Sequence, residues 1–488
     1  MPGQMKLDIA FGVELDTENR WVKLVNIMPW DIIEEQYAKN FGVQKGQEAK
    51  PSRLAFGALY IQNRLVITDE ETVEQICETP SMQYFCGFES YTTERPFDPS
   101  LMVHFRKRIT AEAMKEITAI AFAEDAKKAI EDEKDDDSSG DGRGAGGGKG
   151  NNEAAQPKGT MLLDATCCPS DIHYPTDIWL LNHARELTET IIDELQKQLV
   201  HTGEGKPRTY REVARKAYLS YAKKRKHTNS EIRFAIRQQL QYVCRNLGSI
   251  AAQVDRGASL TGIDKQLYKK LLVISELYRQ QKQMYDEGTH KIDDRIVSIA
   301  QPYLRPIVRG KARTPVEFGA KVATAHIGGF SFIIHLDYEN FAEARHLEES
   351  AEEYRRIFGF YPKVIIGDRA YPTKDNRNYC KARGIRLSGP KVGRKSEEIR
   401  AAEREQIYQD GCTRNAIEGD YGTGKRKYGL DLIMTKLFGT TFTAISFGFF
   451  VKNMERKLRL LVLRAFMKLN IFASFQEIIQ RSWALLCC

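Results

Sequence analysis

The chain has 488 residues, a length that exceeds one ordinary hydrophobic core and predicts two or three domains. Lysine and arginine exceed aspartate and glutamate by 73 − 65 = 8, a modestly basic balance that permits a polyanionic partner without requiring one. The nine cysteines include no C-x-x-C pair, which argues against a disulfide framework or a cysteine zinc site and favours a reducing cytoplasm.

Residues 1–130 predict a helical N-terminal domain, because apolar residues recur at three- and four-residue spacing over 49–64 and 70–77. Ser100 follows a predicted turn and is a candidate cap for the helix after it. Residues 131–158 change from an acidic run to a glycine-rich one and predict a flexible linker. The lysine of this run lacks the spacing of a phosphate-binding loop, and no strand precedes it.

Residues 159–200 and 300–437 predict an α/β domain, a mixed sheet with helices packed on its faces. Two of its strands, 317–324 and 330–336, are expected to pair through a glycine hairpin turn. The helices expected in this domain cover 177–199, 342–358, 374–383, 396–408 and 413–437.

Residues 201–299 predict a basic helical insertion in that domain, and residues 438–488 a C-terminal helical segment. The apolar stretch 437–451 is too short to span a bilayer, so we expect a buried helix there. Because the N-terminus also lacks the apolar run of a signal peptide, we expect no membrane segment and a cytoplasmic location.

Three acids carry the predicted chemistry. Asp164 and Asp368 each end an apolar, strand-like run, and Glu418 lies on one helical stripe with Arg414 and Lys425. Brought together, they would form a hard oxygen site suited to magnesium and phosphate chemistry. The alternatives are that each aspartate is only a turn former or helix cap, and that Arg414 and Glu418 form an exposed i, i+4 ion pair.

The motifs around these acids resemble those of the DDE transposases of bacterial insertion sequences. The matching runs are Leu162-Leu163-Asp164-Ala165-Thr166, Ile365-Ile366-Gly367-Asp368-Arg369-Ala370-Tyr371 and Arg414-x-x-x-Glu418-x-x-x-x-x-x-Lys425. The group with a Tyr-Arg-Glu-Lys signature, close to the insertion-sequence-five type, is the most similar, and 54–59 and 96–108 resemble its N-terminal domain. One position departs from the signature: Gly411 stands where the tyrosine is expected, and Tyr408 lies one helical turn earlier.

The resemblance implies an RNase H-like fold with Asp164, Asp368 and Glu418 as the catalytic and metal-binding residues. They would hold two Mg²⁺ ions, for which Mn²⁺ may substitute, with Asp164 bridging the pair. The reaction implied is hydrolysis at the ends of the element, followed by joining of the 3′-ends to target DNA. Two DNA ends must be brought together, so a homodimer on DNA is expected, associated with the nucleoid of a bacterium or archaeon.

Basic residues supply the predicted DNA contacts. Arg414 and Lys425 would hold phosphates near the metals. The other candidates are Arg215, Lys216, Lys223, Lys224 and Arg225 in the insertion, and Lys391 and Arg394 after the last strand. The alternative reading of these basic residues in the insertion is a solubilising helical face, with the tyrosines of the same helices packed in the core.

Two alternative functions remain open on the sequence: a metal-dependent DNA nuclease that cuts without joining, and a catalytically inactive DNA-binding derivative. His173, His326 and His335 lack a partner at ligand spacing, so ordinary structural histidines are expected at all three positions.

Overall fold

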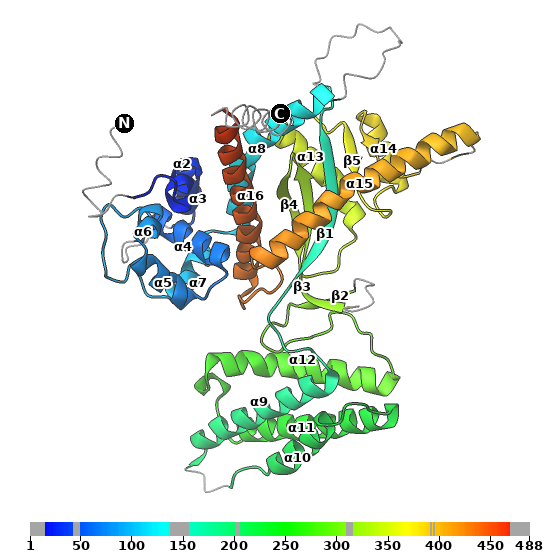
Figure 1. The fold of residues 1–488 in the computed structure, drawn as a ribbon. Helices are drawn as coiled ribbons and strands as arrows, with labels where there is room; N and C mark the ends of the chain where they lie inside the picture. Colours follow the sequence, from blue (N-terminus) through cyan, green and yellow to red (C-terminus); the bar gives the residue numbers. More distant parts are fainter. Residues whose placement is uncertain are drawn as a thin grey trace, which may run out of the picture.

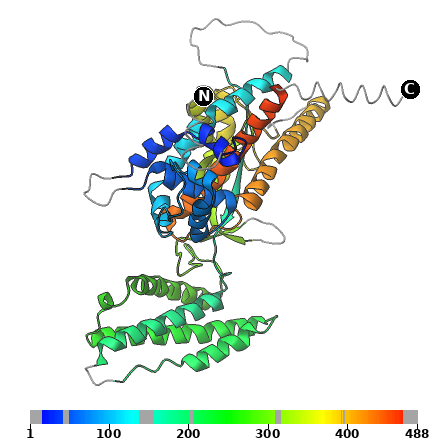
Figure 2. The ribbon, with the colours of Figure 1, turned by 60° about the vertical axis from the view of Figure 1, so that its left-hand side comes forward.

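The computed structural model describes residues 15–41, 49–136, 156–200, 205–308, 316–390, 393 and 396–468. Figure 1 shows three parts: N-terminal helices on the left, a sheet covered by helices in the centre, and a helical bundle below the sheet. The bundle is connected to the sheet by the chain segments that leave and re-enter it (Figure 2).

The N-terminal part is helical throughout its regular structure, as the apolar spacing predicts. Its helices are α2 (Arg20–Ile27), α3 (Trp30–Ala38), α4 (Ser52–Leu65), α5 (Asp69–Glu78), α6 (Pro80–Phe85) and α7 (Leu101–Arg108). α4 is its central element, because every residue from Leu54 to Ile61 is buried. Ser100 precedes α7 but makes no side-chain cap; its amide and hydroxyl both donate to Asp98 instead.

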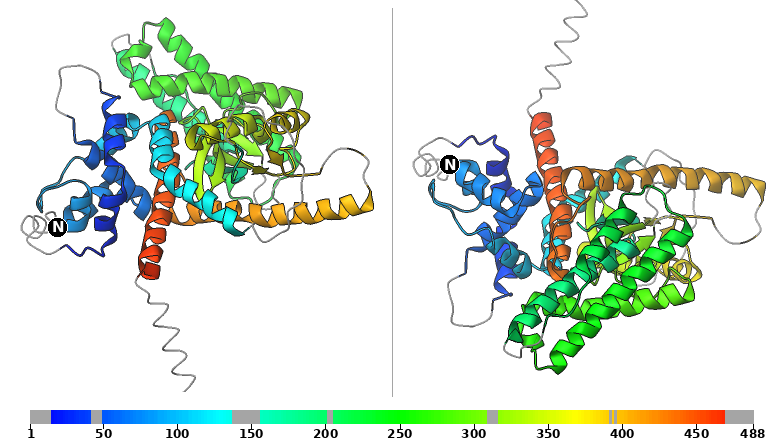
Figure 3. Two further views of the ribbon diagram at one scale, coloured as in Figure 1. Left: turned by 90° about the horizontal axis from the view of Figure 1, so that it is seen from above. Right: turned by 90° about the horizontal axis from the view of Figure 1, so that it is seen from below.

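Two long helices join this part to the sheet. α8 (Ala111–Asp136) continues through the acidic run, so the linker expected from residue 131 is helical to Asp136, and 137–155 lie outside the described residues. α16 (Phe438–Lys468) packs against α4, α7, α8 and the sheet, and lies between the N-terminal helices and the sheet (Figure 3). Its Phe447 and Phe450 are fully buried, as expected for residues 437–451. Among the described residues, no helix is long and apolar enough to cross a membrane.

A six-stranded mixed sheet forms the centre and confirms the predicted α/β class. The strands are β1 (Thr160–Pro169), β2 (Arg305–Val308), β3 (Val316–Ile327), β4 (Phe330–Asp337), β5 (Val364–Ile366) and β6 (Arg386–Leu387). Their order is β2-β3-β1-β5-β6, and β4 also pairs with β3. β1 runs antiparallel to β3 and parallel to β5, and β5 runs parallel to β6. The predicted β3–β4 hairpin is present, and its turn needs Gly328 and Gly329 because both have positive φ angles of 56° and 86°.

The connecting elements of the sheet are η4 (Glu343–His346), α13 (Leu347–Phe358), α14 (Lys374–Ala382) and α15 (Glu397–Lys427). The prediction of two helices over 396–408 and 413–437 was wrong, because α15 is one continuous helix of 31 residues that ends at Lys427. Its four glycines do not interrupt it, although their helix propensity is weak. Gly424 is buried, and a Cβ atom there would lie 2.8 Å from the end of the Leu430 side chain.

The bundle contains α9 (Asp177–Gln198), α10 (Arg211–Ala222), α11 (Asn229–Asp255), η3 (Leu260–Gly262) and α12 (Lys265–Glu287). α9 packs against α11 and α12, with Leu180, Leu181, Val243 and Ile274 in a shared core. The helical insertion therefore begins at Asp177, not at residue 201. Periodicity predicted this helix correctly but carried no information about the element against which it packs.

Candidate active site

Asp164 lies in the middle of β1 instead of at its end. Because β3 pairs with β1 as far as Pro169, the strand continues five residues beyond the position at which the sequence suggested its end. Asp164 stands opposite Thr324 on β3, and its side chain is 17% exposed. The carboxylate is thus fixed on rigid backbone at the centre of the sheet.

Asp368 follows β5 by two residues, as predicted. β5 pairs in parallel with β1, with Ile366 beside Leu162, so the chain after β5 emerges next to Asp164. One carboxylate oxygen of Asp368 accepts a hydrogen bond from the Ala370 amide at 2.8 Å. Asp368 therefore forms the turn that the alternative reading proposed, and it also lies close enough to Asp164 to act on that group's pKa.

α15 crosses β1 and adds the third acid. Its Arg414 guanidinium lies 3.8 Å from the Asp164 carboxylate and donates a hydrogen bond of 3.2 Å to Glu418. Ile417 and Tyr421 lie one helical turn apart on the face of α15 that is buried against the sheet, where they pack with Leu162 and Ile366. Glu418 is 59% exposed, so one arginine connects a largely buried acid with an open one.

A fourth acid, Glu343, belongs to this group, and sequence analysis missed it. Burial raises the pKa of Asp164 to about 6, and the negative charges of Glu343 and Asp368 add to the rise, while the Ala165 amide and Arg414 oppose it. Burial also raises the pKa of Tyr371, to which Glu343, Asp164 and Asp368 contribute. Glu343 forms an ion pair of 3.0 Å with Lys321. No pattern marks Glu343 in the sequence, because it lies in the short turn η4.

The acids form an open group. Within the described ranges, the only three histidine, cysteine or acidic side chains with potential ligand atoms all within 4.8 Å of one another are found elsewhere, on β4, η4 and α13. Arg414 contacts both Asp164 and Glu418. The predicted trio is thus brought to one neighbourhood, but the carboxylates must approach one another to share an ion.

The predicted DNA-contacting residues divide into three sets. Lys425 follows Tyr421 by one turn, and its charge acts on Cys167 of β1. The basic residues of the insertion are all exposed on α10 and the segment after it, where Lys224 pairs with Glu231; they are Arg215, Lys216, Lys223, Lys224 and Arg225. Lys391 and Arg394 lie outside the described residues.

The tyrosine positions differ from the signature. Tyr408 is 68% exposed on α15, as is expected for a side chain that points away from Arg414 on an ideal helix. The tyrosines beside the acids are Tyr371 and Tyr421, both buried. Tyr371 belongs to the matching run around Asp368, and Tyr421 lies on the helical stripe of Arg414, Glu418 and Lys425. Their burial near the acids could not be read from that spacing.

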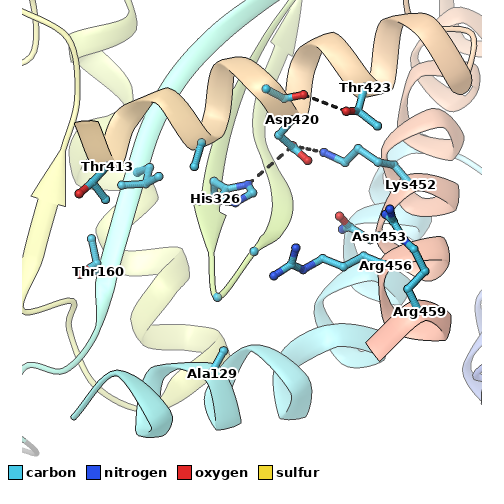
Figure 4. Close-up of a pocket in the computed structure, with 15 residues that line it drawn as sticks. Ala129, Thr160, His326, Thr413, Asp420, Thr423, Lys452, Asn453, Arg456 and Arg459 are labelled. Atoms are coloured by element: carbon cyan, nitrogen blue, oxygen red, sulfur yellow. Dashed lines mark hydrogen bonds and ion pairs between the residues drawn. The ribbon is translucent and has the colours of Figure 1, made fainter. Parts of the chain in front are cut away.

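A second polar cluster lies against the face of α15 that carries Thr413, Ala416 and Thr423. A cavity of about 690 Å³ is bounded there by β1, the β3–β4 turn, α8 and α16 (Figure 4). At its wall the buried Lys452 ammonium pairs with Asp420, which also accepts a hydrogen bond of 2.5 Å from the Ser331 hydroxyl. His326 Nδ1 lies 3.6 Å from Asp420 and 3.3 Å from the Ser331 hydroxyl.

Comparisons with known proteins agree with this reading. A family model described as a transposase DDE domain matches residues 365–455, which include Asp368, Arg414, Glu418 and Lys425. A second, described as a transposase domain (DUF772), matches residues 11–108. Over these residues the chain is similar to transposase domains.

One curated relative was found, an "Uncharacterized protein ORF8 in nfe locus" of Rhizobium meliloti. It is 36% identical over 96 residues, which cover 20% of this chain and 46% of the relative. The chain therefore matches less than half the length of this relative. No solved structure matches the chain.

Proposed function

We propose that the chain is a magnesium-dependent DNA transposase that cuts at the ends of an insertion sequence and joins them to target DNA. The observation that carries the proposal is that three chain segments bring the acids to one region: Arg414 contacts both Asp164 and Glu418, and Asp368 lies close enough to Asp164 to act on its pKa. The match to a transposase DDE domain covers two of these acids and supports their role. The finer placement, within the Tyr-Arg-Glu-Lys group, rests on Arg414, Glu418 and Lys425.

The strand order supports an RNase H-like assignment for the sheet domain. A three-stranded antiparallel part, β4-β3-β1, continues into the parallel strands β5 and β6. The first acid lies on the central strand β1 and the second after its parallel neighbour. The helix α15 then brings the third acid across the sheet.

The residues present fit a divalent metal. Asp164, Asp368 and Glu418 offer hard carboxylate oxygens, the donors that Mg²⁺ prefers, and Asp164 is held beside like charges that a cation would neutralise. Bound Mg²⁺, as a pair of ions, would polarise the phosphodiester and lower the pKa of an attacking water or 3′-hydroxyl. Arg414 would exchange one carboxylate for a DNA phosphate as the acids converge, and Lys425 would hold a phosphate further along β1.

The bundle and N-terminal helices would hold the DNA outside the catalytic centre. The exposed cations of α10 suit the phosphate backbone of the terminal repeats or the target. The match to a second transposase domain supports a role for the N-terminal part in the same reaction. Two ends must be joined together, so we propose that a homodimer assembles on DNA at the nucleoid.

The test is a strand-transfer assay with a pre-cut DNA end that carries the terminal repeat of the element. Asp164→Ala, Asp368→Ala and Glu418→Ala should each abolish joining and cleavage but retain DNA binding. Glu405→Gln, an exposed acid on the same helix, is the matched control and should retain activity. Cleavage without joining by the unaltered protein would favour the nuclease. Transposition that survives Asp164→Ala would favour an inactive DNA-binding derivative.

A further inference from the structure

Two histidines and a glutamate meet on the edge of the sheet domain. His335 of β4 and His346 of η4 stack with ring centroids 4.0 Å apart and an interplanar angle of 18°. His346 Nδ1 lies 2.9 Å from a carboxylate oxygen of Glu349 on α13. One nitrogen or oxygen from each of the three lies within 4.8 Å of the others, which is unique among the residues that the structure describes.

The surroundings of this group suit a bound ion. His346 and His335 are partly buried, and Phe341 packs edge-on against both rings at 5.0 and 4.8 Å. The Asp337 carboxylate lies 3.8 Å from His335 Nε2, where it can orient the ring or complete the ligand set.

We propose that His335, His346 and Glu349 bind one borderline divalent transition-metal ion such as Zn²⁺. Two imidazoles and one carboxylate are a ligand set that zinc accepts and that magnesium, which prefers oxygen, does not. The site is therefore chemically distinct from the carboxylates around Arg414. The sequence shows no partner for His335 at ligand spacing, and in the fold β4 and η4 bring His346 beside it.

The ion would act as a clamp on η4. His346 is the last residue of η4 and Glu343 is the first, so fixing His346 to β4 also fixes the turn that places Glu343 beside Asp164. Metal at the histidine site would thus steady one wall of the acid group without contacting DNA. The inference concerns this ligand set, and it stands or fails independently of the proposed transposition.

Binding is tested on the untagged full-length protein after treatment with EDTA. Zn²⁺ is titrated by calorimetry in excess Mg²⁺, and Co²⁺ is added separately to record the visible absorption of a low-symmetry site. We expect one equivalent of Zn²⁺ for the unaltered protein and for Asp164→Asn. His335→Ala, His346→Ala and Glu349→Gln should lose that equivalent, and Asp337→Asn should bind about 10-fold more weakly.

His104→Ala is the matched control, because His104 is an exposed histidine on α7 and should leave the titration unchanged. Circular dichroism of each variant verifies that the fold persists. Glu349→Gln replaces one carboxylate oxygen by an amide group, so it tests the site even if the alanine variants fail to fold. Absence of a Zn²⁺ equivalent in the unaltered protein would overturn the proposal. Retention of that equivalent by both histidine variants would overturn it as well.

Discussion

The hydroxyl of Tyr421 donates a hydrogen bond of 2.9 Å to the main-chain carbonyl of Asp164, 257 residues earlier in the chain. The same hydroxyl lies 2.7 Å from the Thr324 hydroxyl on β3. The contact with Thr324 is buried and the contact with Asp164 is partly buried, so one side chain fixes α15 to the two central strands. Arg414 and Glu418 precede Tyr421 on the same helix, and their position over Asp164 depends on this anchor.

We expect Tyr421→Phe to destabilise the protein by about 1–3 kcal/mol, because it leaves a buried carbonyl and a buried hydroxyl without their partner. Strand transfer should fall more than DNA binding, since α15 would be held less firmly over Asp164. Denaturant unfolding and a joining assay measure the two effects. Tyr408→Phe, on the exposed side of α15, is the control, and an equal loss in both variants would contradict the anchoring role.

Asp164→Asn should inactivate the enzyme and stabilise its metal-free fold. The folded-state pKa of Asp164, about 6, is above the ordinary 3.8, so the folded protein binds the extra proton between these values and loses stability as pH rises through them. Above about pH 6 the ionised Asp164 carboxylate lowers the free energy of unfolding by its full amount, on the order of 1–3 kcal/mol. Asparagine resembles the protonated acid and removes this penalty.

Thermal unfolding in EDTA at about pH 4 and pH 8 measures this effect. The Tm of the variant should exceed that of the unaltered protein at the higher pH and approach it at the lower. Mg²⁺ should raise the Tm of the unaltered protein and leave the variant nearly unchanged, because the cation neutralises the same charge. A variant that is less stable at the higher pH would show that Asp164 is held by favourable contacts.

Sequence reasoning recovered the parts of this fold that local chemistry determines. The β3–β4 hairpin follows from alternating apolar residues around two glycines, and Asp368 follows from an apolar run that ends where β5 ends. Asp164 was identified, yet its strand was ended too early, because only the length of β3 shows how far β1 extends. Residues that are positioned by contacts with distant parts of the chain have no local sequence pattern that would identify them.

Glu343 illustrates this limit. It lies in the short turn η4, and its negative charge acts on Asp164 of β1 although the two residues are far apart in the sequence. The continuity of α15 was also hidden, since four glycines of weak helix propensity lie within it. Tyr371 and Tyr421 are buried near the acids, whereas the signature places its tyrosine at the position of Gly411.

The basic face of the bundle can be tested through the salt dependence of DNA binding. Lys223 and Arg225 are exposed after α10, whereas Lys224 is already paired with Glu231. If both cations contact phosphates, the double change Lys223→Gln and Arg225→Gln should make the slope of log K against log salt shallower by about 2. Fluorescence anisotropy over a salt series measures the slope.

Lys381→Gln, on α14 of the sheet domain, is the matched control for charge. It should leave the slope within error of the unaltered protein. An unchanged slope in the double variant would show that this face of the bundle is a solvated surface, as the alternative reading of the tract held. The joining activity on a pre-cut end should in either case survive at low salt.

The buried pair of Asp420 and Lys452 should dominate the acid stability of the protein. Burial opposes ionisation of Asp420, but His326 and Lys452 outweigh it and hold the pKa of the carboxyl well below its ordinary 3.8. A depressed pKa contributes stability above the unfolded value, and this contribution is lost as pH falls below about 4. Lys452 is only 4% exposed, so Asp420→Asn leaves a nearly buried ammonium unpaired and should cost about 3–5 kcal/mol.

The double change Asp420→Leu with Lys452→Met distinguishes the effect of the unpaired charge from the effect of altered packing at the cavity wall. It removes both charges and should recover most of the lost stability, because an apolar pair of similar volume can replace a buried ion pair. Guanidinium unfolding between about pH 3 and pH 7 should then show a shallower fall in stability at acid pH for the double variant than for the unaltered protein. The Asp420→Asn protein should be the least stable at neutral pH. Equal stability of the single and double variants would contradict the pairing, since the cost would then come from the cavity wall and not from the unpaired charge.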